Sequence, residues 1–389
     1  MHFHKLPTIY KSLNSFYIMK KEFNVTPWEV SGEVDYEKLV KEFGTSIISS
    51  DMKKKFSKMH PLLRRGLYFS HRDFDKWIEN AEKGKRVSVL TGRGPSEKMH
   101  LGHLVPFLVA KSLQEQFGCE VFIPISDDEK FFVKDSLNFE QSLKNAEDNI
   151  LELIALGFNP KKTFIFQDFV YTDIYKYAAR VAKRLTYSTA KAAFGLKPEN
   201  NVGWSFYPAM QAAHILFPQF KRGKHISVVP VGIDQDPFIR LTRDIAIHSD
   251  FNFDKPAALH AKFVPSLSGG AKMSSSDSAE NNVIYLTDSP DMVKKKINKY
   301  AFSGGKDTLE EHRRLGGNPD IDVSFQYLKY FFEEDDKKLA KIESDYRSGK
   351  LLSGELKAIL IEKINSFLKE HQKAKQKAKS QLDKFIFKD

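Results

Sequence analysis

Cysteine is nearly absent from this chain, and so is any long apolar run. The 389 residues include one cysteine, Cys119, which excludes an internal disulfide and fits a reducing compartment. No apolar stretch approaches the roughly 20 residues that a membrane-spanning helix needs. The first residues have neither an uninterrupted apolar core nor a small-residue cleavage site, so we expect no signal peptide. These absences predict a soluble, cytoplasmic protein with no membrane partner.

Positive charge, in contrast, is abundant. The chain has 61 lysines and arginines against 50 acidic residues, for a formal net charge of +11 and a pI near 9.2. Such an excess fits a polyanionic partner such as nucleic acid, although ordinary solubility charge produces it too. The length is compatible with two or three domains.

From residue 85 onward, short apolar strands alternate with helical stretches. The expected strands are RVSVL, EVFIPIS, TFIFQ and HISVVPVGI, a last short one is VIYL at 283–286, and residues 138–156 have helical spacing. This alternation predicts an α/β fold, a Rossmann-like doubly wound parallel sheet, with ligands at the carboxyl ends of its strands. We assign this catalytic domain to residues 85–287.

The two flanks have a different composition. Residues 1–84 are predicted to form an N-terminal extension, helical over 60–84. Residues 288–389 are rich in lysine and glutamate at helical spacing, which predicts a helical domain with an anionic partner. Its charged tail, 369–385, is interpreted equally well as a solvated helix face or as an RNA contact.

A glycine-rich run, TGRGPSEKMHLGH at 91–103, joins one predicted strand to a helix. Glycines at such a turn let a nucleotide approach the backbone, and the helix N-terminus favours phosphate. His100 and His103 are three residues apart and can face one ligand, while Gly102 leaves room for a flat base. The run predicts a nucleotide site.

A second run, AKMSSS at 271–276, follows Gly269 and Gly270. This hinge predicts a mobile polar loop from which Lys272 can reach a polyphosphate. We expect the two runs, far apart in sequence, to fold around one triphosphate.

Together, H-x-G-H and K-M-S-S-S resemble the paired signature of class I aminoacyl-tRNA synthetases. Four further runs narrow the resemblance to tryptophanyl-tRNA synthetases of the cytosolic eukaryotic and archaeal type, from about residue 26 to the end. They are GIDQDPFIRLTRDIA at 232–246, SFYPAMQAA at 205–213, SDDEKF at 126–131 and AFSGGKDTLEEHRRLGG at 301–317.

The resemblance implies a two-step reaction. L-Tryptophan and ATP would form tryptophanyl-adenylate and pyrophosphate, and the aminoacyl group would then pass to tRNA(Trp). ATP would enter as a substrate with Mg²⁺, and no protein-ligated structural metal is expected. The resemblance also implies a homodimer and makes residues 288–389 the anticodon-binding domain.

Site residues follow from the same resemblance. The catalytic set would be His100, His103 and Lys272, and ATP would be bound by Arg93, Gly102, Lys130, Asp234, Gln235, Met273 and Ser274. Tryptophan would contact Gly92, Gly94, Ser126, Glu129, Tyr207, Gln211, Gln235 and Ile239, and the anticodon would contact Lys306 and Asp307. Other interpretations stay open: solvated surface charges at Arg93, Lys130 and Glu129, core packing at Tyr207 and Ile239, and a helix-capping turn at Lys306 and Asp307.

Two positions depart from the family pattern. Leu90 stands where this branch usually has tyrosine, and Pro124 where it usually has glutamine. In the family those side chains meet the indole N–H, and neither leucine nor proline can accept a hydrogen bond through its side chain. We therefore expect a substitute acceptor, either a water, a backbone carbonyl or a hydroxyl such as that of Ser126.

Three alternatives remain. A small-molecule nucleotidyltransferase also uses an H-x-G-H turn, but such enzymes generally lack the other runs. A tyrosyl-tRNA synthetase-like enzyme is favoured by Leu90 and Pro124 and disfavoured by GIDQD and AFSGGKD. A non-catalytic RNA-binding paralogue is disfavoured by the intact His100, Gly102, His103 and Lys272.

Overall fold

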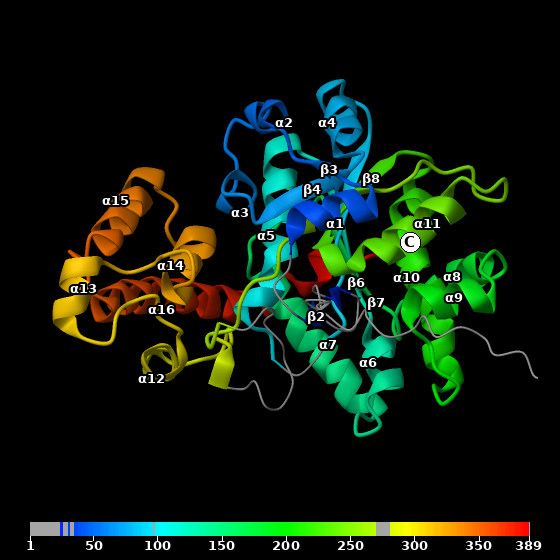
Figure 1. Ribbon diagram of the computed structural model, residues 1–389. Coiled ribbons are helices and arrows are strands. Elements are labelled where there is room, and N and C mark those ends of the chain that lie inside the picture. The colour runs from blue at the N-terminus through cyan, green and yellow to red at the C-terminus, as the bar shows by residue number, and fades with distance from the viewer. Residues whose placement is uncertain (1–23, 26–29, 32–34, 96–97, 270–280, 389) are drawn as a thin grey trace, which may run out of the picture.

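A seven-stranded sheet forms the centre of the molecule, with helices on both of its faces (Figure 1). The computed structural model describes residues 24–25, 30–31, 35–95, 98–269 and 281–388. The sheet order is β3-β4-β9-β8-β5-β6-β7, and β1 and β2 form a separate pair. The strands are β1 Asn24–Val25, β2 Val30–Ser31, β3 Ser46–Ile47, β4 Tyr68–Arg72, β5 Val87–Leu90, β6 Glu120–Ile125, β7 Thr163–Gln167, β8 Ile226–Gly232 and β9 Ala257–Ala261.

The helices fall into three groups along the chain. Before β5 lie α1 Tyr36–Phe43, α2 Ser50–Lys54, α3 Pro61–Arg64 and α4 Phe74–Glu82. Among the parallel strands lie α5 Leu101–Phe117, α6 Asp127–Val133, α7 Phe139–Ile154, α8 Ile174–Ala182, α9 Tyr187–Phe194, α10 Val202–Arg222, the 3-10 turn η1 Ile233–Gln235 and α11 Asp236–Ala246. After β9 lie α12 Pro290–Tyr300, α13 Leu309–Leu315, α14 Val323–Tyr327, the π-helical η3 Leu328–Phe332, α15 Asp336–Arg347, α16 Ser353–Ala378 and η4 Lys379–Lys384.

Strand order confirms the predicted fold class. Strands β9, β8, β5, β6 and β7 are mutually parallel, while β3 and β4 join antiparallel at the β9 edge. The chain begins the parallel sheet at β5, adds β6 and β7 on one side, and then adds β8 and β9 on the other. This is a doubly wound order, and its direction reverses between β5 and β8.

The four main strand predictions are confirmed, but two other predictions are wrong. Residues 60–84 are not one helix, because β4 lies between α3 and α4. Residues 283–286 form no strand; Tyr285 makes only a single bridge to His100. The predicted helix at 138–156 is α7, whose first turn is capped by the Asn138 side chain.

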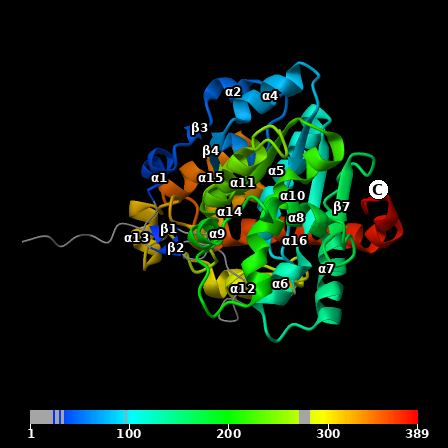
Figure 2. The ribbon, with the colours of Figure 1, turned by 90° about the vertical axis from the view of Figure 1, so that its right-hand side faces the viewer.

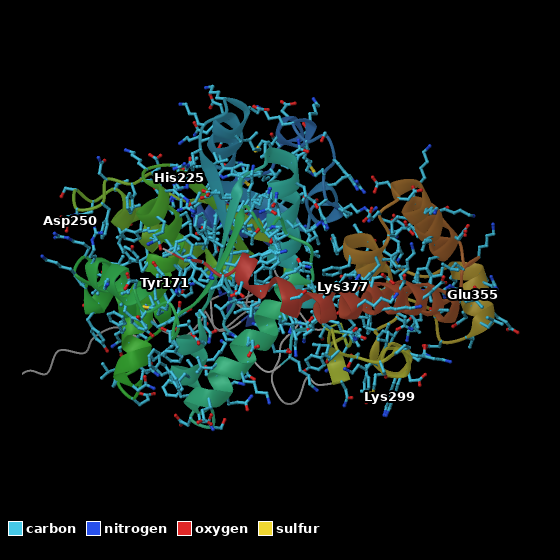
Figure 3. The ribbon with its side chains drawn as sticks, turned by 180° about the vertical axis from the view of Figure 1, so that it is seen from behind. Tyr171, His225, Asp250, Lys299, Glu355 and Lys377 are labelled. Carbon is cyan, nitrogen blue, oxygen red and sulfur yellow. The ribbon has the colours of Figure 1, made fainter. Side chains whose placement is uncertain are left out.

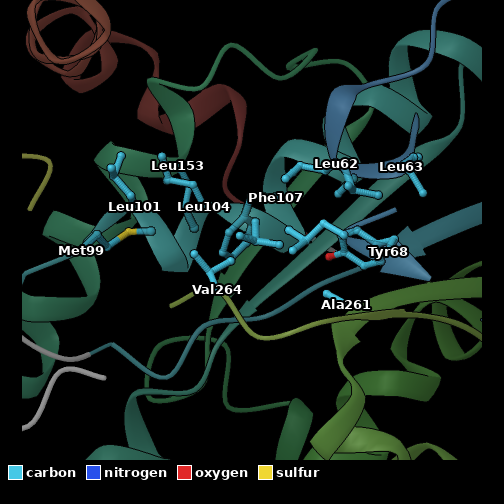
Figure 4. Close-up of a cluster of buried hydrophobic side chains, with 14 of the residues drawn as sticks. Leu62, Leu63, Tyr68, Met99, Leu101, Leu104, Phe107, Leu153, Ala261 and Val264 are labelled. Atoms are coloured by element: carbon cyan, nitrogen blue, oxygen red, sulfur yellow. The ribbon is translucent and has the colours of Figure 1, made fainter. Parts of the chain in front are cut away.

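Alternating strand residues divide the apolar side chains between two clusters, one on each face of the sheet. Val89 and Val121 contribute to the larger cluster, whereas their neighbours Leu90 and Phe122 contribute to the cluster under α10. In the larger cluster, side chains from α3, α5, α7 and β4 meet, as Figure 4 shows. The labelled residues there include Leu62, Leu63, Tyr68, Leu104, Phe107 and Leu153.

The sheet continues across the predicted division at residue 84. Upstream of it, β4 pairs with β9, and α4 buries Trp77, whose Nε1–H donates to the Ser88 carbonyl of β5 at 2.9 Å. Residues 46–82 are therefore part of the central sheet structure.

The last long helix, α16, connects the C-terminal helices to the sheet. It begins among α12–α15, at the labelled Glu355 in Figure 3, and passes the labelled Lys377 toward the sheet. Beyond it, the Phe385 carbonyl accepts from the Ile165 N–H of β7 at 2.8 Å, and the Phe387 N–H donates to the Ile165 carbonyl at 2.7 Å. Figure 2 shows this C-terminal segment beside β7. The tail covers the edge of the sheet.

A buried carboxylate fastens α16 to α7. Glu152 accepts from His371 at 2.6 Å and from Lys375 at 2.7 Å, and its side chain is 2% exposed. Burial acts to raise the pKa of Glu152, but these two partners outweigh it and hold the pKa below its ordinary value. The charged tail predicted from the sequence is thus partly a packing surface. Within the described residues, no helix has the length and apolar character to cross a membrane.

Replacing Glu152 with alanine should destabilise the protein, because the buried His371 would lose its hydrogen-bond partner while Lys375 would keep only Asp148. We expect the free energy of unfolding in a urea titration to fall by about 2 kcal/mol, as for other buried groups left without a partner. Glu343→Ala removes an exposed partner of Arg347 and should have little effect. Equal losses in the two variants would contradict this role of Glu152.

Candidate functional site

A cavity of about 460 Å³ lies where the strand order reverses, at the carboxyl ends of β5, β6 and β8. Ligands of doubly wound sheets bind in this crevice, and the volume is in the range of small-molecule sites. Residues after β5 and β6, the end of β8, and helices α10 and α11 line it. They are Leu90, Thr91, Gly92, Arg93, Gly94, Pro106, Pro124, Ser126, Glu129, Lys130, Tyr207, Gln211, His214, Ile215, Val229, Pro230, Val231, Gly232, Gln235, Phe238 and Ile239.

The structure brings together all residues predicted around the amino acid. Gly92, Gly94, Ser126, Glu129, Tyr207, Gln211, Gln235 and Ile239 line the cavity. Arg93 and Lys130, predicted for ATP, line it too, as do the two departures Leu90 and Pro124. Their contacts with a ligand stay predictions.

Two glycines allow the backbone after β5 to lie close to its neighbours. A Cβ added at Gly92 would lie 3.0 Å from the Pro124 carbonyl oxygen, and one at Gly94 would lie 2.9 Å from Cε of Lys130. At Gly94 it would also overlap the Glu129 carboxylate. The missing side chains leave room for Glu129 and Lys130 at the cavity mouth.

Charged side chains of both signs meet at this mouth. The Lys130 ammonium lies 2.7 Å from Oε1 of Glu129, and the Tyr207 hydroxyl donates to Oε2 at 3.3 Å. Burial lowers the pKa of Arg93 to about 10, with Glu129 acting in the opposite direction. Arg93 therefore stays charged at neutral pH, so the site offers two cations and one carboxylate.

Both predicted histidines lie at the start of α5, outside the cavity lining. Their rings stack at 3.4 Å between centroids. Burial, and next the nearby Arg93, lower the pKa of His100 to about 3 and that of His103 well below its usual range. Both rings are thus neutral at pH 7.

The proton on His103 can be assigned from its partner. The His100 backbone N–H donates to Nδ1 of His103 at 3.1 Å, so the neutral ring keeps its proton on Nε2. Both ring nitrogens of His100 are buried without a hydrogen-bond partner within the described part of the chain. Gly102, between the two histidines, lies in the first turn of α5 and is only partly exposed. The turn therefore holds unused hydrogen-bonding groups at a helix N-terminus.

The chain that follows the serine-rich run returns to this same helix start. The Leu101 N–H donates to the Ile284 carbonyl at 3.0 Å, and the Leu286 N–H donates to the Met99 carbonyl at 2.9 Å. Residues 281–286 thus lie beside the H-x-G-H turn. Lys272, Met273 and Ser274 themselves lie outside the described residues.

The GIDQD run places its polar residues in different surroundings. The Gln235 amide lines the cavity and donates to Asp234 at 3.1 Å; Asp234 is buried. Asp236 is fully buried, where Arg72 donates to its two oxygens at 2.6 and 2.8 Å. Burial acts to raise the pKa of Asp236, but Arg72 and next His260 lower it to about 2. Asp236 therefore joins α11 to β4 and is a structural group.

Sequence analysis missed several cavity residues, above all His214. On α10, Tyr207, Gln211 and His214 follow one another at spacings of four and three, which places them on one helix face. That spacing could have revealed His214 from the sequence. Thr91, Pro106, Ile215, Phe238 and the backbone of 229–232 also line the cavity and carry no motif of their own.

Behind the cavity, carboxyls of Asp127, Asp128 and Asp168 lie within 4.8 Å of one another, close enough to hold a cation. The Gln167 amide and the Phe169 N–H donate to Asp127. Burial, and next the neighbouring Asp168, raise the pKa of Asp128 to about 9. Asp128 is thus protonated at pH 7, which weakens the group as a cation site.

The residues predicted for the anticodon lie elsewhere. Lys306 and Asp307 are exposed just before α13, on the opposite side of the molecule from α10 and α11 (Figure 1). Thr308 caps α13 by accepting from the Glu311 N–H at 3.1 Å. The first turn is therefore capped without Lys306 or Asp307.

Known proteins resemble the chain over almost its whole length. Residues 82–369 match the family described as tRNA synthetases class I (W and Y). The tryptophan–tRNA ligase of Sulfurisphaera tokodaii is 50% identical over 376 residues, covering 95% of this chain and 96% of that one. The one from Saccharolobus solfataricus is 49% identical over 375 residues, with 95% and 96% covered.

A solved structure agrees with these relatives. The tryptophanyl-tRNA synthetase of Plasmodium falciparum is 40% identical and superposes with a TM-score of 0.84, covering 91% of this chain and 98% of that one. The resemblance predicted from the motifs is thereby confirmed. From the matched residues and the doubly wound sheet, we conclude that the chain belongs to the class I tRNA synthetases of the W and Y family.

Proposed function

We propose that this protein is a tryptophan–tRNA ligase, which activates L-tryptophan with ATP and transfers it to tRNA(Trp) in translation. The observation that carries the proposal is the cavity where the strand order reverses between β5 and β8. Its charged end holds the Glu129 carboxylate and the Arg93 and Lys130 cations, beside the H-x-G-H turn. A tyrosine-specific enzyme and a non-catalytic RNA-binding paralogue are the alternatives. We propose the cytoplasm as its compartment.

Activation joins the tryptophan carboxylate to ATP. A carboxylate oxygen forms a bond to the α-phosphorus while the bond to the bridging oxygen of pyrophosphate breaks. The nucleophile is already ionised, so the protein must align the reactants and stabilise charge on the phosphates. The Nε2–H of His103, the start of α5, and the Arg93 and Lys130 cations are suited to that role.

ATP is proposed to enter with Mg²⁺ on its phosphates. Gly102 would lie under the adenine, and Asp234 and Gln235 would contact the nucleotide from η1, the turn that follows β8. Lys272, with Met273 and Ser274, would reach the β- and γ-phosphates. The return of residues 281–286 to the start of α5 supports this, because it brings the far end of that segment beside the H-x-G-H turn.

Tryptophan is proposed to bind with its ammonium at Glu129. This carboxylate already accepts from Tyr207 and Lys130, so it is held at the cavity mouth. Oε1 of Gln211 is buried without a partner among the described residues and can accept from the same ammonium. Apolar side chains beyond it, including Ile215, Phe238 and Ile239, leave the indole a dry surface.

tRNA is proposed to contact the C-terminal helices and the positively charged surface. Lys306 and Asp307 are exposed before α13 and are free of the capping interaction, so they can meet unstacked anticodon bases. The net charge of +11 favours the polyanion.

A homodimer is proposed on the basis of an exposed apolar patch around α6. Phe139 lies 4.7 Å from Phe169 between ring centroids, and the Asn201 amide donates to the Phe132 carbonyl, which draws three segments together. The patch consists of Val133, Phe139, Val170 and Val202, which are 49%, 48%, 65% and 85% exposed. Such contiguous apolar surface is typical of a protein interface.

An ATP–pyrophosphate exchange assay tests the proposed function. Exchange should depend on tryptophan and be at least about a hundredfold slower with tyrosine at equal concentration. Exchange with tyrosine alone would overturn the amino-acid assignment. Exchange with neither would favour a nucleotidyltransferase or the non-catalytic alternative.

Gly94→Ala should weaken tryptophan binding about tenfold or more while leaving the free energy of unfolding nearly unchanged. The new methyl group overlaps only the flexible ends of Glu129 and Lys130, which can move away, and the charge-assisted contact to the ammonium is then lost. Calorimetric titration and urea unfolding measure the two quantities. Gly354→Ala on α16, where nothing lies within 4 Å of the added atom, is the control. Unaltered affinity in Gly94→Ala would remove Glu129 from the ammonium site.

Mass measurement by light scattering tests the proposed dimer. The wild type should have twice the chain mass at micromolar concentration, and Val170→Glu with Val202→Glu should reduce it to the mass of one chain, because charges would be buried in the interface. Ile321→Glu, at an exposed apolar residue outside the patch, should leave the dimer intact. A monomeric wild type would contradict the proposal.

A further inference from the structure

A buried indole N–H needs an acceptor, and the two side chains nearest the strand ends cannot provide one. Leu90 and Pro124 line the cavity, and neither carries a polar side-chain atom. Leu90 and Phe122 belong to the cluster under α10, so Pro124, two residues after Phe122, faces the same helix. An acceptor for this end of the cavity must therefore come from elsewhere, and α10 lies opposite. This inference rests on the proposed function, because tryptophan supplies the N–H.

His214 occupies the suitable place on α10. It lines the cavity, is 4% exposed, and follows Tyr207 by seven residues, about 10 Å along the helix axis. Tyr207 contacts Glu129 at the charged mouth, so His214 lies toward the apolar end. An amino acid whose ammonium is at Glu129 would extend its side chain along α10 toward this ring.

A buried carboxyl fixes the orientation of the ring. Nε2 of His214 lies 2.9 Å from Oδ1 of Asp168, the residue that follows β7. The Asp168 backbone N–H donates to the Ile125 carbonyl at 3.2 Å, which ties Asp168 to the strand end next to Pro124. Burial lowers the pKa of His214 to about 4, so the ring is neutral at pH 7 and carries one proton.

The position of that proton follows from Asp128. Burial raises the pKa of Asp168 well above its ordinary range and, together with the nearby Asp168 charge, raises that of Asp128 to about 9, so the two buried carboxyls keep a proton between them at pH 7. Their mutual interaction acts to raise the pKa of Asp128 and to lower that of Asp168, so we place this proton on Asp128, from which it is donated to Asp168. Oδ2 of Asp168 has no other partner among the described residues and is available for it. Asp168 then accepts from His214, which leaves Nδ1 of His214 with a free lone pair.

We propose that Nδ1 of His214 accepts the hydrogen bond of the indole N–H, and that Asp168 is the positioning residue that sets its tautomer. Nδ1 has no hydrogen-bond partner within the described residues, and the ring lines the cavity. Asp128 acts through Asp168: it keeps the shared proton, so Asp168 stays ionised and accepts from Nε2 of His214.

Other acceptors in the cavity have different geometry. The Ser126 side chain faces the Tyr207 hydroxyl at the charged mouth, where it acts to lower the pKa of Tyr207. Gln211 lies one helical turn closer to Glu129 than His214 does, where its carbonyl suits the ammonium. His214 is thus the acceptor placed for the far end of the ligand.

Replacing the indole N–H by sulfur tests this assignment. The full-length enzyme is assayed by ATP–pyrophosphate exchange with tryptophan and with β-(3-benzothienyl)alanine, which has nearly the same shape but no N–H. We expect the wild type to prefer tryptophan by about tenfold or more in kcat/KM, because the isostere leaves Nδ1 without a donor. The ratio of the two values is the readout.

Variants of His214 and Asp168 should change that ratio in a defined way. His214→Phe should bring it near one, while His214→Asn, whose carbonyl oxygen replaces Nδ1, should keep most of it. In Asp168→Asn the new carbonyl oxygen accepts the Asp128 proton, so the amide N–H₂ must donate to Nε2 of His214. The proton of the His214 ring then lies on Nδ1, which can no longer accept from the indole, and the preference for tryptophan should be lost. Ile215→Val, in the same wall, should affect both amino acids alike.

The outcomes separate the two proposals. A wild type without exchange on tryptophan would overturn the proposed function itself. Tryptophan exchange with no preference over the isostere, or an unchanged ratio in His214→Phe and Asp168→Asn, would overturn the role of His214. Loss of the ratio in Gln211→Leu with its retention in His214→Phe would transfer the acceptor to Gln211. If His214→Phe does not fold, His214→Asn and Asp168→Asn carry the test.

Discussion

The site depends on a close backbone approach at the end of β5. Past Leu90 the chain still pairs with β6: the Thr91 N–H donates to the Phe122 carbonyl, the Arg93 N–H to the Pro124 carbonyl, and the Ser126 N–H to the Arg93 carbonyl. Side chains at Gly92 and Gly94 would collide with Pro124, Glu129 and Lys130. Because the two strands can run together this far, the charged residues of α6 reach the cavity formed at the strand-order reversal, just before α5 begins.

Three consecutive acids on α6 then take three different roles because their surroundings differ. Asp127 is held by the Gln167 amide and the Phe169 N–H and closes the turn after β7. Asp128 is buried beside Asp168 and stays protonated. Glu129 alone reaches the cavity with cationic and hydroxyl partners. A sequence of like charges can thus give one carboxylate in the cavity without mutual repulsion at the site.

Contiguous motifs made much of the fold and the site predictable. The strands from β5 to β8 are short apolar runs with β-branched residues, and the cavity residues predicted to contact the amino acid lie inside recognisable runs. The missed parts depend on partners distant in sequence. The alanine-rich β9 has weak strand propensity, and β4 has only two aromatic residues before its polar end; the two strands pair with each other. Arg72 and Asp236, 164 residues apart, form a pair that no local pattern announces.

The same reasoning explains why the orientation of His214 escaped the sequence. Gln211 belongs to a recognisable run, whereas His214 has meaning only beside Asp168, which follows β7 and is held by the Ile125 carbonyl. Strand β7 also pairs through Ile165 with the C-terminal tail, and that tail continues α16 from the helices that we propose for the anticodon. Strand β7 therefore connects Asp168, which orients His214, to α16, which reaches the C-terminal helices. Because β7 is held on both edges, Asp168 is held in place, and a fixed carboxyl is what keeps His214 in a single tautomer.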